Sequence, residues 1–219
     1  MPIIFFVMLL AGAQTPIERQ DCTPTSVKAC SEDELLFLLS DDGINRFFPN
    51  VDPEGVRFQA SRRVGTVKLL ETLRASDDGS QREAIVRILS ERDDSKEIAS
   101  TFASLLNKDI SRASCWMAEY LAHRGNQRAL YLLNDHSGEW WLSSAEWASV
   151  VRVFGEQRFY PATPNLIESL GAASLNLGQA ALEALMILYP GTKPSDIATI
   201  ASAKAYFRAR ANAIKHDQR

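Results

Sequence analysis

The stretch from Arg112 to Asp135, which reads RASCWMAEYLAHRGNQRALYLLND, decides the fold class of this protein. Its first half spaces apolar residues at i, i+3, i+4, i+7 and i+8, which puts them on one stripe of an α-helix. These residues are Ala113, Trp116, Met117, Tyr120 and Leu121. Arg124, Gly125 and Asn126 then stop this helix and start another, because they supply a cation, a left-handed residue and a capping side chain. The stretch therefore predicts a helical hairpin, which buries its apolar face by stacking on similar units.

The composition of the chain is that of a protein with one substantial core. It has 219 residues, of which 46% are hydrophobic and 23% are charged, so a single globular or solenoid domain is expected. The formal net charge of −3 argues against a nucleic-acid partner, since proteins that bind nucleic acids usually carry a basic face. His123, His136 and His216 stand singly, so neither a metal site nor a cofactor is predicted.

The N-terminus resembles an export signal. Residues 3–11 form an unbroken apolar run, and Ala11-Gly12-Ala13 fits the small-residue pattern of signal-peptidase cleavage before Gln14. The run is shorter than the roughly 20 apolar residues that span a bilayer, so no stable membrane span is expected in the mature chain. The signal is atypical because no Lys or Arg precedes the run; the alternative is a buried first helix. We expect residues 1–13 to be a signal peptide and the protein to be periplasmic or extracellular.

Residues 14–30 are rich in Thr, Pro and Ser, which predicts an irregular N-terminal arm. Cys22 lies inside the arm and Cys30 at its end. In the oxidising compartment that export implies, two cysteines at this spacing can form a disulfide that restrains the arm. We therefore name Cys22 and Cys30 as a candidate disulfide.

Three capping boxes of the pattern S-x-x-E mark helix starts, at Ser31, Ser80 and Ser143. The first opens residues 31–79, where a longer helix is expected over residues 56–74. This part matches the later rhythm poorly, so we interpret it as a divergent set of capping helices, which the open end of a repeat array needs.

From residue 80 onward the pattern repeats. Comparable apolar points near the ends of successive first helices are 32, 33 and 34 residues apart, by subtraction of their positions. These points are Leu89, Leu121, Phe154 and Leu188. A near-constant step of this size is typical of a repeat array. The predicted fold is all-α, an α-solenoid of stacked antiparallel helical hairpins over residues 80–219 with a period of about 33 residues.

The stretch at 112–135 resembles the short HEAT repeat that also occurs in phycobilisome-lyase-like proteins. The resemblance rests on the small-residue helix, the Gly125-Asn126 turn and the Arg128-Ala129-Leu130 helix that follows it. Gly155-Glu156 and Gly191-Thr192 hold similar turn positions without the full pattern. Tetratricopeptide repeats, which have a nearby period, are the main structural alternative. Either family implies an α-solenoid whose concave surface is built mainly by second helices.

HEAT-like families include scaffolds, bilin lyases, a di-iron hydroxylase and DNA glycosylases. The chain has no His followed by Glu, which the hydroxylase's metal ligands would need. No catalytic residues are assigned: Asp135, His136 and Ser137 name the members of a hydrolase triad, but sequence neighbours cannot align three side chains for proton relay.

The best local candidate for binding follows the second helix of the hairpin. Glu139, Trp140 and Trp141, together with His136, combine stacking and hydrogen-bonding groups able to bind a peptide or glycan. Trp147 lies on the apolar stripe and is expected in the core. The function that we expect is an exported, non-catalytic HEAT-like scaffold that binds a protein partner through its concave surface. The alternative is a small-ligand-binding enzyme or chaperone-like modifier, lyase-like by analogy with the family.

Overall fold

The protein is all-α in the computed structural model, which describes residues 30–40, 60, 62–92, 95–106, 111–137 and 143–217, the side chains of 214–217 excepted. These residues form ten α-helices and two 3₁₀ helices, η2 and η3, and contain no strand. The α-helices are α1 (Glu32–Phe37), α4 (Thr66–Ala75), α5 (Gly79–Ser90), α6 (Lys96–Leu105), α7 (Arg112–His123), α8 (Gln127–Asp135), α9 (Ser144–Glu156), α10 (Thr163–Ser169), α11 (Leu175–Leu188) and α12 (Ile200–Asp217). The 3₁₀ helices are η2 (Tyr160–Ala162) and η3 (Pro194–Ile197). None of the helices in these ranges combines the length and hydropathy that crossing a bilayer requires.

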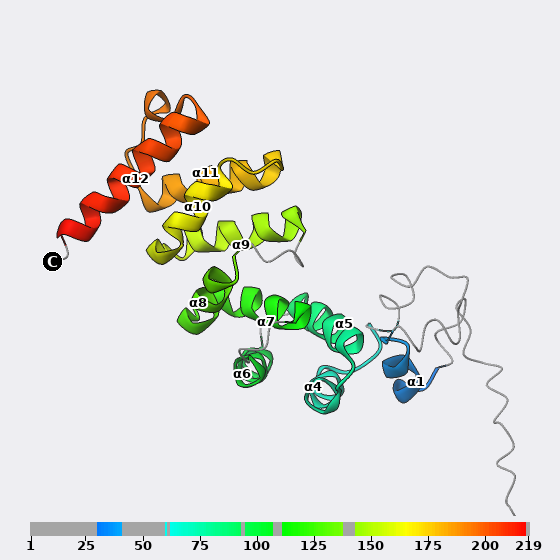
Figure 1. Cartoon of the computed structure of the whole chain (residues 1–219). Helices are drawn as coiled ribbons and strands as arrows, with labels where there is room; N and C mark the ends of the chain where they lie inside the picture. The colour runs from blue at the N-terminus through cyan, green and yellow to red at the C-terminus, as the bar shows by residue number, and fades with distance from the viewer. Residues whose placement is uncertain are drawn as a thin grey trace, which may run out of the picture.

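The helices pack in two rows. Helices α5, α7, α9 and α11, which we call the first row, each pack against the next. The second row, α4, α6, α8, α10 and α12, packs against the first through the pairs α4–α5, α6–α7, α7–α8 and α10–α11. Figure 1 shows the helices following one another in chain order from one end of the molecule to the other.

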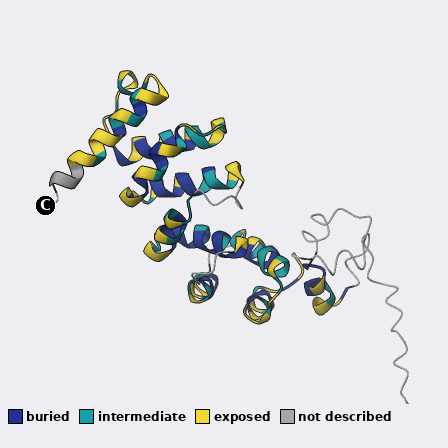
Figure 2. Cartoon of the chain, in the orientation of Figure 1, coloured by how far each residue is buried: buried dark blue, intermediate teal, exposed yellow. Residues whose placement is uncertain are grey.

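The core lies between neighbouring helices and runs along the whole array. Figure 2 shows buried residues on the helix faces that meet their neighbours. The largest fully buried side chains come from both rows and include Leu73, Ile85, Leu89, Phe102, Phe154 and Phe207. Each such side chain stabilises the fold by about 1.5–3 kcal/mol through removal of its apolar surface from water.

Two of the three predicted capping boxes are confirmed. Ser31 and Ser143 each accept the backbone N–H of the Glu three residues later, and that Glu accepts the N–H of the Ser. The box predicted at Ser80 is wrong. The helix begins at Gly79, and Asp78 caps it by accepting the backbone N–H groups of Ser80 at 2.9 Å and Gln81 at 3.1 Å. A carboxylate at the N-cap outcompetes a hydroxyl two residues later, because it can accept both unpaired N–H groups.

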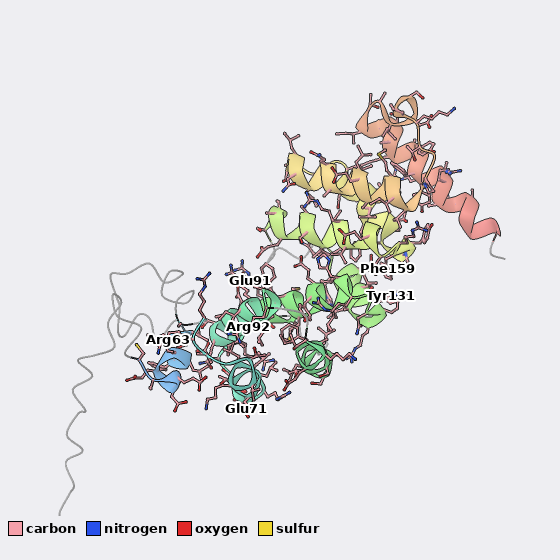
Figure 3. All side chains as sticks on the ribbon, turned by 180° about the vertical axis from the view of Figure 1, so that it is seen from behind. Arg63, Glu71, Glu91, Arg92, Tyr131 and Phe159 are labelled. Carbon is pink, nitrogen blue, oxygen red and sulfur yellow. The ribbon has the colours of Figure 1, made fainter. Side chains whose placement is uncertain are left out.

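The long helix predicted over residues 56–74 is also wrong, since residues 62–65 form a turn and α4 begins only at Thr66. A long-range contact holds this turn. The guanidinium of Arg92, labelled in Figure 3, donates to the carbonyl of Val64 at 2.7 Å and to Oγ1 of Thr66 at 2.6 Å. The Oε1 atom of Glu32 accepts the N–H of Gly65 at 3.0 Å. Periodicity within the segment could not reveal these partners.

Left-handed turns end three helices of the first row at regular spacing. In the described part of the chain, φ is positive at Gly125 (75°), Arg158 (49°) and Gly191 (87°), positions that are 33 residues apart. At the first two, the next backbone N–H reaches back over the helix end, from Asn126 to Leu121 at 3.0 Å and from Phe159 to Phe154 at 2.9 Å. The turn assigned to Gly155 from the sequence is wrong, because Gly155 is buried inside α9 and Arg158 holds the equivalent of Gly125.

Arg158→Gly is expected to stabilise the protein by roughly 0.5–1 kcal/mol. A non-glycine residue in the left-handed region destabilises the folded state by about 1–2 kcal/mol, and glycine removes this strain. Glycine also has more conformational freedom in the unfolded chain, which cancels part of the gain. Gly191→Ala should destabilise by a similar amount, since its Cβ would meet nothing within 4 Å and only the backbone term acts. Urea unfolding of both variants measures the two effects. Equal stability of Arg158→Gly and the wild type would contradict the assignment of strain.

Candidate binding surface

Of the four residues predicted for binding, the structure describes only His136. His136 is the C-cap of α8 and is half-buried. Glu139, Trp140 and Trp141 lie outside the described residues, so their grouping with His136 stays a prediction. The same holds for the disulfide, because Cys30 is buried just before α1 but Cys22 lies outside the described residues.

A small apolar pocket lies beside the chain that follows His136. Its volume is about 100 Å³. It is lined by Ser137, Trp147, Val151, Phe154, Asn165, Leu166, Ser169 and Leu177. With about 30 Å³ of liquid volume per water molecule, it has room for a single aliphatic side chain. Trp147, expected in the core, packs against the core and also forms part of this wall.

A larger pocket of about 370 Å³ lies between α10 and α12. Its lining is more polar and consists of Thr163, Pro164, Asn165, Ile167, Glu168, Arg208, Ala211 and Asn212. Glu168 accepts hydrogen bonds from Lys204 at 3.1 Å and from Arg208 at 2.7 Å. These two bonds hold the pKa of the Glu168 carboxyl below its ordinary value. Glu168 therefore stays ionised at neutral pH. It can hold Lys204 and Arg208 in place but is not suited to donating a proton.

Polar contacts join α8, α10 and α12 into one surface of the second row. The side-chain amide of Asn165 donates to the carbonyl oxygen and to Oδ1 of Asn134, both at 3.0 Å, and Asn165 also lines both pockets. The Glu168 contacts continue the connection to α12. Sequence reasoning missed Asn165, Glu168, Arg208 and Asn212. The spacing of Lys204 and Arg208 at i and i+4, 36 and 40 residues after Glu168, is the sequence feature that points to part of this group.

The first row carries its own chain of polar contacts between neighbouring helices. Arg112 on α7 pairs with Glu83 on α5 at 3.4 Å and with Glu146 on α9 at 2.9 Å. Further along the same helices, Ser149 donates to Glu119, and His123 lies 3.4 Å from Glu156. Each of these contacts between α7 and α9 joins residues 30 to 34 positions apart.

Two carboxyls on this face have pKa values shifted in opposite directions. Burial raises the pKa of Glu119, and the hydrogen bond from Ser149 and the charge of His123 only partly oppose it. Burial also acts to raise the pKa of Glu146, but hydrogen bonds from Ser143 and Arg112 outweigh it, and its pKa lies below the ordinary value. Glu119 is thus a carboxyl that binds its proton more tightly in the folded state.

We expect Glu119→Gln to stabilise the protein at neutral pH. Because the folded pKa of Glu119 is raised, its contribution to stability is fully present below the unfolded pKa and is lost as pH rises through the folded pKa. The neutral amide keeps an acceptor for Ser149 and avoids the cost of burying a charge. Urea unfolding should show the variant and wild type converging below about pH 4. Glu183→Gln on the exposed face of α11 is the control. If Glu119→Gln raised the free energy of unfolding equally at neutral pH and below about pH 4, a raised pKa of Glu119 could not be the cause.

The described residues contain no group of three His, Cys, Asp or Glu side chains arranged to hold a metal ion. Comparisons with models of known protein families, with curated proteins and with solved structures found no match to this chain.

Proposed function

We propose that this chain is a HEAT-like α-solenoid that serves as a scaffold and binds a protein partner. The observation that carries the proposal is the regular step at which structural features recur. Left-handed turns lie 33 residues apart, and polar contacts join residues about one step apart within both rows. In a repeat array each unit contacts only its neighbours, so each residue meets its counterpart one period along the chain.

The surface that supports binding is the second-row face of α8, α10 and α12. Solenoids use one row of helices to present an extended surface to their partners. Asn165 lines two pockets, an apolar one between α9, α10 and α11 and one between α10 and α12 that is rimmed by Glu168 and Arg208. An apolar cavity with a polar rim fits the anatomy of protein interfaces, in which anchor side chains fill pockets and rim charges fix orientation.

Export is part of the proposal and depends on residues 1–13, which lie outside the described residues. Mass spectrometry of the protein purified from its native host tests it directly. A mature chain that begins at Gln14 in the exported fraction supports export. A chain that keeps its first residues and stays in the cytoplasm contradicts it.

The scaffold proposal is tested by co-purification of the full-length, C-terminally tagged protein from the fractionated native host. We expect a stoichiometric protein partner, and Arg208→Ala combined with Asn212→Ala should weaken its binding about tenfold or more. Both side chains are exposed, and solvent screens the Glu168 contact, so its loss should change the stability of the protein little. The matched control, Gln179→Ala with Glu183→Ala, removes an exposed pair 2.9 Å apart on first-row helix α11.

The alternative function, a modifier that binds a small ligand, is favoured by one observation. The α10–α12 pocket of about 370 Å³ falls in the range of roughly 300–1,000 Å³ that small-molecule sites occupy. If the protein comes down alone in both fractions, and a metabolite extracted from it is lost in the Arg208→Ala, Asn212→Ala variant, this alternative replaces the scaffold. A protein partner that is lost in the same variant, with no bound metabolite, supports the scaffold.

A further inference from the structure

We propose that Tyr131, Arg158 and Tyr160 form a docking surface for an acidic segment of the protein partner, an inference that rests on the proposed scaffold function. We call these three residues the Tyr–Arg surface. They come from α8, from the turn after α9 and from the first position of η2. The surface is therefore assembled across two successive hairpins.

Two buried rings hold the exposed tyrosines in place. The ring of Tyr131 meets that of Phe159 edge-on, with 4.9 Å between centroids, and Figure 3 labels this pair where α8 lies beside the end of α9. Tyr160 meets buried Tyr189 edge-on at 5.9 Å. Tyr131 and Tyr160 nevertheless remain 49% and 44% exposed. A tyrosine fixed in this way loses little conformational entropy when a partner covers it.

Arg158 stands one residue before Phe159 and two before Tyr160, and its φ of 49° puts its backbone in the strained left-handed region. Phe159 is buried, whereas Arg158 and Tyr160 on either side of it are exposed. The side chains on both sides of the buried ring are therefore accessible to a partner. Glycine occupies both equivalent left-handed positions, Gly125 and Gly191. A residue held in a sparsely populated conformation that glycine would adopt without strain points to a use for its side chain.

The hydrogen-bonding groups of the surface determine the chemistry of the occupant. Within the described residues, the guanidinium of Arg158 pairs with no carboxylate, and nearby Glu156 is paired with His123 at 3.4 Å. In that part of the chain the hydroxyls of Tyr131 and Tyr160 also have no hydrogen-bond partner. A guanidinium with an open fork binds carboxylates in bidentate geometry, and phenol hydroxyls can donate to the same oxygens. These donors complement a segment rich in Asp and Glu.

The experiment selects short random peptides displayed on phage against the immobilised full-length protein, then measures the synthesised peptides by fluorescence anisotropy. We expect enrichment of Asp and Glu, and a loss of affinity of about tenfold or more when these residues are replaced by Asn and Gln. Arg158→Gly should cause a similar loss although it relieves backbone strain, so unfolding cannot explain the result. Tyr160→Ala should weaken binding in the same direction. Arg152→Ala, which removes an exposed arginine on the first-row side of α9, should leave affinity unchanged.

Several outcomes would overturn the inference. One is that Arg158→Gly binds the selected peptides as tightly as the wild type; another is that the neutral peptides bind equally well. Binding of anionic lipid vesicles or RNA through Arg158, without enrichment of acidic peptides, would assign the surface to another class of partner. If the co-purified partner is lost in the α10–α12 variant but kept by Arg158→Gly, the scaffold function stands and the Tyr–Arg surface alone fails. If no protein partner is captured at all, the scaffold function itself fails.

Discussion

Gly155→Leu is expected to destabilise the protein by about 3 kcal/mol, the upper end of the cost of overpacking a core. Gly155 lies inside α9 where that helix crosses α11. A Cβ at this position would lie 2.8 Å from the Cα and 3.0 Å from the Cβ of Ala184. Because the first of these atoms belongs to the backbone, the two helices would have to separate. Thermal unfolding should show a fall in Tm of about 6–12 °C for a chain of this size.

The same glycine-to-alanine change at two positions gives a matched control. Gly155→Ala should destabilise, since even a methyl group meets Ala184. Gly178→Ala on α11 should stabilise by roughly 0.5–1 kcal/mol, because its Cβ would lie 3.6 Å from the nearest atom, the carbonyl oxygen of Leu170, and alanine favours the helix. Equal effects at the two sites would show that the close approach of α9 and α11 is not required.

Phe207→Ala is expected to cost about 3–5 kcal/mol of local stability and to release α12 from the array. Phe207 is fully buried, and its ring lies 5.9 Å from that of Tyr189 and 5.2 Å from that of Tyr206. Helix α12 is the last of the second row and packs mainly against α10 and η3. A helix at the end of a packed row can open while distant helices stay folded.

Hydrogen exchange measures this release. The amides of α12 should lose protection in Phe207→Ala, whereas those of α5 and α7 should keep theirs. Ile200→Ala, at a position that is 58% exposed on the same helix, should change protection little. A uniform loss across all helices would mean that α12 is coupled to the whole array.

Features that depend on short-range patterns could be predicted from the sequence. The helical hairpin at Arg112 to Asp135, the left-handed Gly125 and the Asn126 cap follow from side chains within one turn of each other. The boxes at Ser31 and Ser143 follow in the same way. Helix periodicity and capping are local, because the hydrogen bonds that they satisfy lie within four residues along the chain.

The residues that line the two pockets could not be predicted from the sequence, because they come from several helices. The predicted binding residues Glu139, Trp140 and Trp141 lie outside the described residues, so the pocket beside Ser137 and Trp147 does not confirm them. Its other walls come from α9, α10 and α11. The larger pocket needs α12 to lie beside α10 and bring Arg208 to Glu168. Contacts between residues about 30 to 40 positions apart leave no pattern within a single helix.

The all-helical class, the helix starts after Ser31, Asn126 and Ser143, and the step of about 33 residues could be predicted from the sequence, since each depends on local propensity, capping or periodic burial. Contacts between helices were needed to show that Arg92 holds the turn that replaces the predicted long helix, that Gly155 allows close packing, and that Arg158 takes the place of glycine after α9. The physical reason is the same in each case. The role of such a residue is set by the free energy of its contacts with a neighbouring helix, and these contacts can outweigh the local preference of the chain.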